Sequence, residues 1–490
     1  MPAAVAGPSS ATAPKTTLRE DLRALIQSPR ELWLIYLATF FEYLGIFSFL
    51  PTLPLWLSND FGMDDKRAGW WAATFSTLVT LFVFLVGSIA DTLGVRRTLL
   101  ISFALAAATR LGMAIAPSTD MAIVTLLAFG FAYATTSPVL QAAVQRASAK
   151  RTRSFAFSFW YVSFNLAGAL TGPFVIDLTR RAFLDESTGK LVKRAIALPL
   201  LGETTFSANT AIMALGFVFA TIAFCVIMLV RKDFEHRVDP EDAAAGAGKA
   251  QKVNPLVALR DVLKDRPFWR FMVLLVLLSL VRMMFQHMHF TWPKYVLREQ
   301  GEGFPVGTVW SLNAFLILFL APLGTALTRN RKPFEVLLFG AFISSLSPFV
   351  LCLGSAMPFQ IAMILLLTIG EALWSPRLYE YNVSIAPRGR EATYVSLASL
   401  PYFLAKFLVG PTSGYLLATF VPEQGPRNAA MLWAIIGLST IIGPVGIWLG
   451  RSWISKNERE SEPAAAEAPA ATKERPSQPA AAAESSASAS

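Results

Sequence analysis

Residues 70–97 read WWAATFSTLVTLFVFLVGSIADTLGVRR, an uncharged apolar stretch followed by an acid, a glycine and two arginines. A helix needs about 20 predominantly apolar residues to cross the hydrocarbon core of a bilayer, and the part before Asp91 has that length. Asp91, Gly94, Arg96 and Arg97 then stand where such a helix leaves the membrane. This stretch therefore predicts a transmembrane helix that ends in a short, positively charged loop.

The same alternation of apolar blocks and charged loops runs along the whole chain. Of its 490 residues, 54% are hydrophobic and only 16% are charged, and the mean hydropathy is +0.48. A soluble protein of this length would need more charge to cover its surface. Since lipid cannot hydrogen-bond an open backbone, the blocks are predicted as helices. We predict an all-α membrane protein with twelve transmembrane helices, at about 33–58, 69–90, 98–116, 121–143, 154–178, 208–230, 268–292, 305–328, 334–355, 358–384, 392–420 and 429–450.

Positive charge gathers in alternate loops, which predicts the orientation of the chain. Cytoplasmic loops keep Lys and Arg, so both termini are expected in the cytoplasm of a multi-pass cell-membrane protein, here a bacterial inner-membrane protein. The basic loop 179–207 is the exception, and long loops can translocate despite their charge. The net charge of +10 lies in these loops, so we expect the lipid bilayer, not nucleic acid, as its partner. We expect a monomer.

Markers in the two halves of the sequence repeat. Gly87 recurs as Gly324, and Gly172-Pro173 recurs as Gly410-Pro411, with the same spacing to within one residue. This repeat predicts a parallel pair of six-helix bundles. The expected organisation is a disordered N-terminus with a short amphipathic helix (1–30), an N-terminal bundle (31–232), a cytoplasmic linker (233–267), a C-terminal bundle (268–452) and a disordered tail (453–490).

The motif Gly87-Ser-Ile-Ala-Asp91-Thr-Leu-Gly94-Val-Arg96-Arg97 resembles the signature loop between the second and third helices of the major facilitator superfamily. The resemblance implies a major facilitator fold. It also implies that the acid of this loop holds the two bundles together on the cytoplasmic face when the site opens outward. The alternative is a loop that only sets topology.

Three further stretches resemble the proton-dependent oligopeptide transporter (POT) branch of that superfamily. They are Glu42-Tyr43-Leu-Gly-Ile-Phe, Asn165-Leu-Ala-Gly and Gly-Glu371-Ala-Leu-Trp374-Ser-Pro. The resemblance implies proton coupling, and it implies that Glu371 holds an amino group of the solute.

Two positions depart from the POT pattern. Ser137 stands where the branch has a lysine before a proline, and no acid is found near Gln286. We therefore expect a small zwitterionic or anionic solute without assigning it as a peptide.

Ionisable side chains inside a bilayer are costly, and they usually face a cavity or a partner. A charged carboxylate near the middle of a span, as at Glu371, favours protonation, which suits a proton carrier. Arg282 is the preferred partner of Glu371, and a static buried ion pair is the alternative. The ionisable residues expected inside the bilayer are Glu42, Arg110, Arg282, His287, His289, Glu371, Arg377, Glu380 and Lys406.

Arg282, Gln286 and His289 share one helical face at i, i+4 and i+7 and predict a polar stripe. His287 and His289 are two residues apart and lack a neighbouring Cys or acid cluster, so no metal site is predicted. The residues expected to bind the solute are Glu42, Tyr43, Tyr161, Asn165, Arg282, Gln286, His289, Glu371 and Trp374. Glu371 and Glu42 are expected to carry the proton.

Gating residues are expected near the cytoplasmic ends of the helices. Thr328 takes the place of the acid in the second copy of the loop motif, so only the first copy offers a carboxylate. Lys406 has Glu380 as a candidate partner. The residues expected to act in gating are Gly87, Asp91, Gly94, Arg96, Arg97, Arg377, Glu380 and Lys406.

These features predict a transporter and not an enzyme, with a small-molecule substrate, protons as the energy source and no cofactor. The sequence lacks a phosphate-binding Gly-Lys loop, so ATP is not expected to drive it. Proton-coupled symport is the first hypothesis. The stretch Gly168-Ala-Leu-Thr-Gly172-Pro173 resembles the fifth-helix motif of proton-coupled drug antiporters, although small residues four apart also simply pack helices. The remaining alternative is a non-transporting receptor on the same fold.

Overall fold

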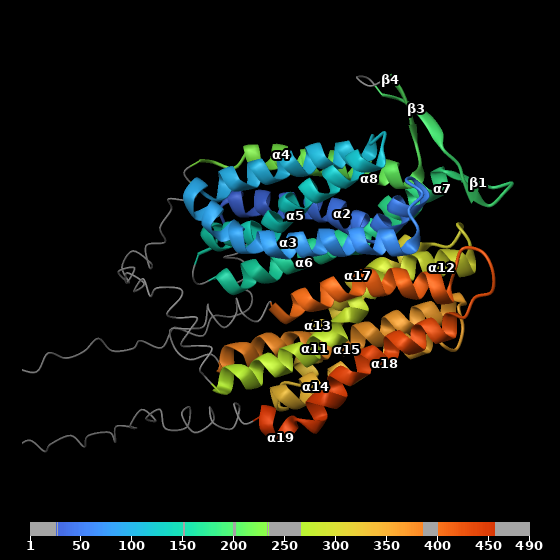
Figure 1. Ribbon diagram of the computed structural model, residues 1–490. Coiled ribbons are helices and arrows are strands. Elements are labelled where there is room, and N and C mark those ends of the chain that lie inside the picture. Colours follow the sequence, from blue (N-terminus) through green and yellow to red (C-terminus); the bar gives the residue numbers. More distant parts are fainter. Residues whose placement is uncertain are drawn as a thin grey trace, which may run out of the picture.

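The computed structural model describes residues 26, 28–149, 152–198, 202–232, 234, 266–385 and 400–455. Within them the chain forms two bundles of long helices that lie side by side, one from each half of the sequence (Figure 1). The first half contains α2 (Arg30–Asn59), α3 (Asp65–Leu93), α4 (Val95–Ala114), α5 (Thr119–Ala147), α6 (Arg153–Thr171), the π-helix η2 (Gly172–Asp177), α7 (Leu178–Ala182) and α8 (Ala208–Met228).

The second half repeats this arrangement and adds two short helices. Its elements are α11 (Arg266–Phe290), α12 (Trp292–Gln300), α13 (Val306–Leu327), α14 (Pro333–Val350), α15 (Met357–Ile385), α17 (Leu400–Phe420), α18 (Ala429–Leu449) and α19 (Arg451–Ile454). Their bounds follow the predicted spans closely. The predicted span 392–420 is described only from residue 400, and the predicted span 334–355 ends earlier, at Val350.

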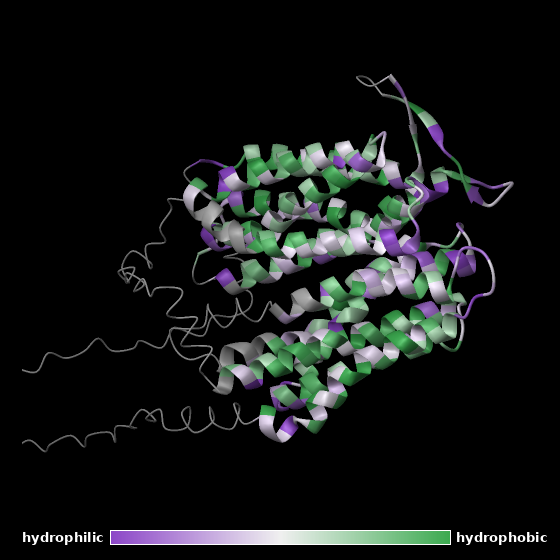
Figure 2. Cartoon of the chain, in the orientation of Figure 1, coloured by the Kyte–Doolittle hydropathy of each residue, from purple (hydrophilic) through white to green (hydrophobic). Residues whose placement is uncertain are grey.

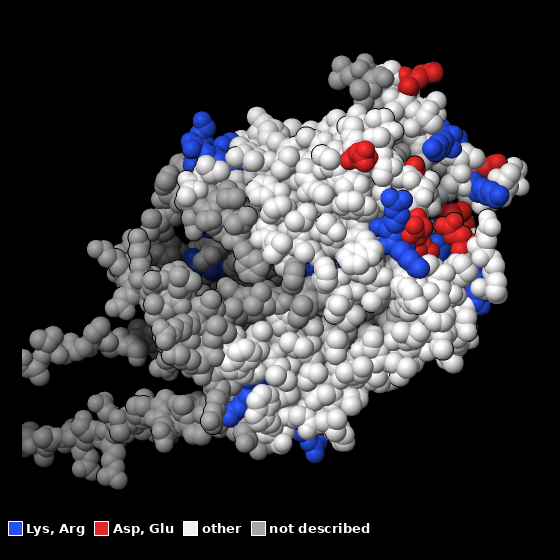
Figure 3. Space-filling model, in the orientation of Figure 1, with Lys and Arg blue, Asp and Glu red and all other residues white. Residues whose placement is uncertain are grey.

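Ten of the helices in the described ranges are long and apolar enough to cross a membrane. Helices α3 and α17 have 29 and 21 residues, which is also long enough to cross the membrane. Apolar residues cover the lengths of the helices and polar residues gather near their ends (Figure 2). On the face drawn in Figure 3, charged side chains likewise lie toward the two ends and leave a largely uncharged band between them. The predicted all-α membrane fold is confirmed.

The loop predicted at 179–207 contains short strands, which the sequence reading did not anticipate. Strands β1 (Leu184–Asp185) and β2 (Lys190–Leu191) form one antiparallel hairpin. Strands β3 (Arg194–Leu198) and β4 (Gly202–Phe206) pair in a second antiparallel sheet. We call the end of the molecule that carries these strands the strand end (Figure 1).

The bundles approach each other most closely at glycines. A Cβ added to Gly172 would lie 2.0 Å from the carbonyl oxygen of Gly307, and one added to Gly69 would lie 2.4 Å from that of Gly410. Only glycine allows such contact between helix backbones. The repeated Gly-Pro markers of the sequence are therefore equivalent contact points, joining η2 to α13 in one case and α17 to α3 in the other.

The remaining organisational predictions concern the segments outside the bundles. The N-terminal segment 1–30, the linker 233–267 and the tail 453–490 lie almost entirely outside the described residues.

Candidate functional site

A cavity of 420 Å³ lies between the two bundles. Its walls come from α2 and α6 of the first bundle and from α11, α13 and α15 of the second. A volume of this size suits a small solute. The described residues thus include a site built jointly by both halves of the chain.

Seven of the nine side chains predicted to bind the solute line this central cavity. Tyr161 and Asn165 lie on α6, while the other five lie on α11 and α15 of the opposite bundle. The seven are Tyr161, Asn165, Arg282, Gln286, His289, Glu371 and Trp374. Helical spacing explains the α11 group, since residues at i, i+4 and i+7 share one face.

The carboxylate of Glu371 and the guanidinium of Arg282 share the central cavity. The Asn313 side-chain amide donates to Glu371 Oε2 at 2.9 Å and to Thr368 Oγ1 at 3.0 Å. Arg282 lies over the ring of Trp374, 5.5 Å from its centroid, and interacts electrostatically with Glu371. The cavity therefore offers one acid and one base to a solute, with an aromatic surface beside the base.

Aromatic side chains cover the central cavity toward the strand end. The ring of Phe47 on α2 lies 5.9 Å from that of Trp310 on α13, so the two bundles meet here. Trp310 Nε1 donates to His289 Nδ1 at 3.2 Å, one residue before α11 ends. His289 and Trp310 stand within about one turn of the ends of α11 and α13 that face the strand end.

Glu42 lies elsewhere, in the core of the first bundle. Both its carboxylate oxygens accept hydrogen bonds from Arg110, at 2.8 and 3.0 Å, and both side chains are buried. The Arg110 guanidinium also stacks 4.7 Å from the ring centroid of Phe129. Glu42 is therefore held by a bidentate ion pair and does not line the central cavity. Its predicted part in solute binding and proton transfer stays a prediction.

Tyr43 lies behind the wall of the central cavity. Its ring contacts Phe47 at 5.4 Å and Phe164 at 5.2 Å, and both of those residues line the cavity. Tyr43 thus supports the aromatic wall without belonging to the lining.

A buried ion pair joins the bundles at the strand end. Asp65, at the start of α3, accepts two hydrogen bonds from Arg298, at 2.8 and 2.9 Å, and one from Lys294 at 2.9 Å. Lys294 and Arg298 lie on α12 in the second half and are 4% and 9% exposed. Charge-assisted, bidentate contacts of this kind are strong and geometrically specific.

A second contact across the bundles uses a helix N-terminus. Asp177, the last residue of η2, accepts hydrogen bonds from the backbone N–H groups of Gly307 and Thr308, both at 2.7 Å. These N–H groups belong to the first turn of α13 and have no partner within that helix. The carboxylate therefore caps a helix of the opposite bundle. The strand end is closed, while the surface is hollowed between the bundles at the opposite end (Figure 3).

The end opposite the strands carries four of the predicted gating residues: Gly94, Arg96, Arg97 and Arg377. Lys406 lies instead near His289 of the central cavity, with which it interacts electrostatically. Gly94 has φ 83°, a backbone conformation that favours glycine, and it separates α3 from α4. Arg96 donates to the carbonyl oxygens of Val230 at 2.7 Å and Met228 at 3.0 Å, so it ties this loop to the end of α8. Arg97 is exposed.

In the second bundle, Arg377 donates to Thr328 Oγ1 at 3.0 Å. Thr328 is the residue that replaces the motif acid in the second loop, so a hydroxyl there still binds a guanidinium. Lys406 is half-buried on α17. The side chains of Gly87, Asp91 and Glu380 lie outside the described part of the structure, so their predicted roles stay predictions.

The two histidines point in different directions. His287 Nδ1 lies 2.7 Å from Thr291 Oγ1 in the core of the second bundle, whereas His289 lines the central cavity. Among the described residues, no group of three or more His, Cys, Asp or Glu side chains is placed to hold a metal ion.

Sequence reasoning missed several residues of the central cavity and of the closed end. The amide of Asn313 and the indole of Trp310 stand in an otherwise apolar helix, which is a signal that could have found them. Charge is common near predicted span ends and carries little information there. The missed residues of the closed end stand in such places: Asp65, Asp177, Lys294 and Arg298. Gly45 and Gly216 leave room for the Arg110 guanidinium beside Glu42, a fit that the sequence alone does not indicate.

The fold and the central cavity define a class of protein: a helical membrane transporter with a cavity between two repeated bundles. The family model of the Major Facilitator Superfamily matches residues 35–410. The chain belongs to this superfamily of secondary transporters, and it is not an enzyme. It is also similar to an uncharacterized MFS-type transporter, YqjV of Bacillus subtilis (strain 168), with 22% identity over 416 residues that cover 84% of this chain and 91% of the relative.

Solved structures similar to this chain include members of the POT family. One, in complex with 5-aminolevulinic acid, has a TM-score of 0.68 and 14% identity and covers 87% of this chain and 97% of its own. A peptide transporter POT in complex with sulfate has a TM-score of 0.66 and 15% identity, covering 88% and 96%. PepTSo has a TM-score of 0.66 and 16% identity, covering 89% and 98%. The likeness to the POT branch holds at the level of the fold.

Proposed function

We propose that this chain is a proton-coupled symporter that takes up a small zwitterionic or anionic solute by alternating access. The observation that carries the proposal is the shared central cavity of Glu371 and Arg282, between two bundles that are closed against each other at one end. Secondary transporters of this architecture bind their solute near the midplane and rock the bundles about it.

The chemistry of the central cavity supports a charged small solute. The Arg282 guanidinium suits a carboxylate or another anionic group, and Glu371 suits an ammonium group or a proton. Gln286, Asn165 and His289 add hydrogen-bonding groups on both bundles, so one solute can touch both. The rings of Tyr161 and Trp374 are proposed to enclose its apolar part.

Glu371 is proposed as the proton carrier. A charged carboxylate costs energy at this depth, and the Asn313 amide provides a neutral donor that tolerates either protonation state. A proton on Glu371 ends its electrostatic attraction to Arg282 and leaves that guanidinium for the carboxylate of the solute, so proton and solute bind together. Glu42 already has Arg110 as a full counter-ion, so we propose Glu371 as the more important of the two acids.

The closed strand end is proposed to face the outside of a bacterial inner membrane, with both termini in the cytoplasm. The basic loops at the opposite end support this orientation. In that orientation the structure is open toward the cytoplasm. The Asp65–Arg298 and Asp177–Gly307 contacts would have to break before the solute could enter from outside.

Drug antiport has less support. The Gly168–Pro173 stretch, which favoured it, serves as a packing surface: a Cβ at Gly168 would lie 2.9 Å from Ala314 Cβ, and Gly172 touches Gly307. Packing of small residues therefore accounts for the motif.

Uptake into liposomes that carry an imposed pH gradient tests the proposal. We expect acid outside to stimulate accumulation of a zwitterion from a panel of amino acids, dipeptides and 5-aminolevulinate. Glu371→Gln should abolish proton-driven accumulation while exchange of solute across the membrane remains measurable. Glu335→Gln, an exposed acid on α14, is the matched control and should behave as wild type.

Three results would speak against the proposal. Normal accumulation by Glu371→Gln would remove that residue from coupling. Extrusion of drugs against the gradient would favour antiport. Absence of flux for every solute would favour a receptor that kept the transporter fold.

A further inference from the structure

A second, larger cavity opens at the strand end, with a volume of 690 Å³. It lies between the end of α2 and the start of α8 in the first half, and α12 and the loop after α17 in the second. The hairpin residues 190–193 line it as well. It shares no lining residue with the central cavity, so it is a separate space.

Charged side chains dominate the lining of this strand-end cavity. Acids are fewer than bases: Asp60, Glu302 and Glu423 line it. The five basic residues are Lys190, Lys193, Lys294, Arg298 and Arg427. Two of these bases, Lys294 and Arg298, share the carboxylate of Asp65, so the cavity presents both signs of charge, as a zwitterionic ligand requires.

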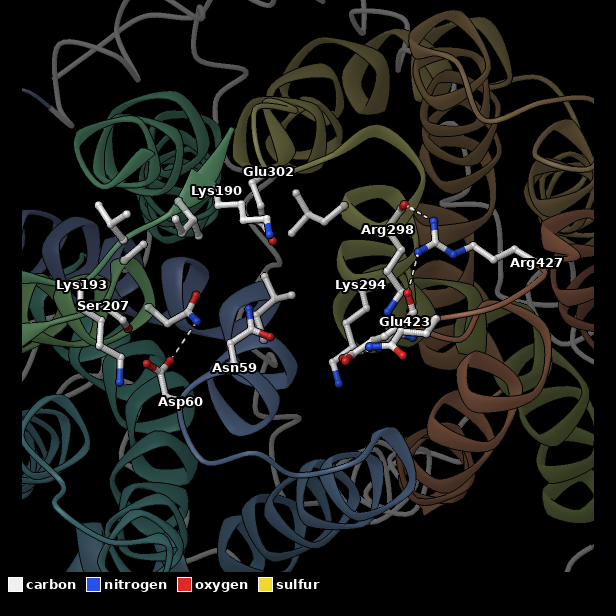
Figure 4. A pocket seen from close by; sticks show the side chains of 17 residues that line it. Asn59, Asp60, Lys190, Lys193, Ser207, Lys294, Arg298, Glu302, Glu423 and Arg427 are labelled. Carbon is white, nitrogen blue, oxygen red and sulfur yellow. Dashed lines mark hydrogen bonds and ion pairs between the residues drawn. The ribbon is translucent and has the colours of Figure 1, made fainter. Parts of the chain in front are cut away.

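The two sides of the cavity differ in what they can bind. Figure 4 shows Asp60 on one side and Arg298 with Lys294 on the other, across an open space. Asp60 is half-buried and accepts a hydrogen bond from Asn209 Nδ2 at 2.9 Å. Burial raises the pKa of the Asp60 carboxyl above its ordinary value, so an added positive charge beside it would be stabilising.

Side chains of the protein already pair with Arg298 and with Asp60, the two groups that a ligand would have to bind. Glu423, whose side chain is 70% exposed, places a carboxylate oxygen 3.1 Å from Arg298 Nη2. Lys193, also exposed, interacts electrostatically with Asp60. Because exposed ion pairs contribute little stability, a ligand can replace these partners at small cost.

We propose that the strand-end cavity is a second binding site, for a small zwitterion whose ammonium group pairs with Asp60 and whose carboxylate replaces Glu423 on Arg298. The solute class rests on the proposed function. The walls of the site come from both bundles, so the site is complete only while the strand end is closed. A ligand bound there therefore favours the closed state.

Isothermal titration of the full-length protein in lipid nanodiscs tests this inference, with dialanine as the probe. The titration is done in an Arg282→Met/Glu371→Gln background, which removes the charged groups of the central cavity. We expect one binding event to remain. Asp60→Asn should weaken that binding about tenfold, the worth of a charge-assisted hydrogen bond. Asp64→Asn, an exposed acid that lines neither cavity, is the matched control and should leave it unchanged.

A second variant should strengthen the binding of dialanine instead of weakening it. Glu423→Gln removes the competing carboxylate from Arg298, so dialanine should bind severalfold more tightly. In the unmutated strand-end cavity, N-acetyl-dialanine and dialanine amide, which lack the ammonium and the carboxylate respectively, should each bind about tenfold more weakly than dialanine.

The inference is overturned if no binding remains in the background variant, or if Asp60→Asn and Asp64→Asn have the same effect. It is also overturned if both blocked dipeptides bind as dialanine does. These titrations use no proton gradient. If no binding at the strand end is found but proton-driven uptake is intact, the proposed function still stands. If binding at the strand end is found but proton-driven uptake is absent, only the proposed function is contradicted.

Discussion

Glu42 and Glu371 have similar neighbours in the sequence but different surroundings in the structure. Each is an acid within a long apolar helix, and each resembles an acid of the same transporter branch. Glu42 is fully buried in the first bundle, with both oxygens on Arg110. Glu371 lines the central cavity, and a neutral amide, that of Asn313, donates to it at 2.9 Å.

The difference separates an acid with a fixed counter-ion from an acid that faces a cavity. A buried carboxylate with a full bidentate counter-ion has little reason to change its protonation state, because losing its charge leaves the partner unpaired. A carboxylate that faces a cavity can exchange one cationic partner for another. Two acids that look alike in sequence therefore differ in what can reach them, because of the two only Glu371 lines the central cavity.

The largest effect should come from removing Arg110. Arg110→Met leaves Glu42 buried without a counter-ion and should lower the free energy of unfolding by about 3–5 kcal/mol. Arg282→Met, at the cavity wall, should lower it by less than about 1 kcal/mol, because water can reach the remaining acid. Unfolding in detergent, followed by tryptophan fluorescence, measures both.

The double variant Glu42→Leu/Arg110→Met is the control for that prediction. It replaces the ion pair by apolar groups of similar size, and such replacements are often neutral. Stability close to wild type is expected. If the double variant is as unstable as the single one, lost packing and not the unpaired charge explains the result.

A third buried carboxylate, Asp177, extends the comparison from one bundle to the contact between two. Asp177→Ala removes a helix cap worth about 1 kcal/mol, so the open form of the strand end should become about fivefold more populated. Spin labels at the exposed positions Arg67 and Gln424, one on each bundle, report the distance distribution. Asp185→Ala, an acid whose hydrogen bonds stay within its own hairpin turn, should leave the distribution unchanged.

A further effect of similarly small size concerns Asn313, the neutral partner of Glu371. Asn313→Leu removes one amide hydrogen bond and should lower the free energy of unfolding by about 1 kcal/mol. In a double-mutant cycle with Glu371→Gln, we expect a coupling free energy between the two side chains of about 1 kcal/mol as well. Zero coupling would show that Asn313 does not support Glu371, and the contrast with the Glu42 pair would then lose its structural basis.

Much of the fold could be predicted from the sequence, since span length and loop charge are local properties. The positions of the long helices follow from where apolar blocks begin and end, whereas the short polar helix α12 was not predicted. The strands of 184–206 escaped prediction because they lie in a charged loop with no strong alternation. Of the site, the α11 stripe of Arg282 and His289 was predictable, since a helix fixes which residues share a face.

Pairing between distant segments was not predictable in the same way. Nothing local to Glu42 indicates that Arg110, on another helix, meets it and leaves it outside the central cavity. Nor does the charge pattern near the span ends indicate that Asp65 meets Arg298 and Asp177 meets Gly307. Such contacts depend on how helices rotate and cross, which many side chains decide together.

By itself, the sequence determined that this chain lies in a membrane as repeated apolar helices, with charge held in a few buried positions. Length, hydropathy and charge suffice for that, because the bilayer imposes the same cost on every segment. The tertiary structure alone decided which buried charges have a counter-ion and which face a cavity. The physical reason is that an electrostatic cost depends on what lies within a few ångströms, and helices far apart in sequence supply those neighbours.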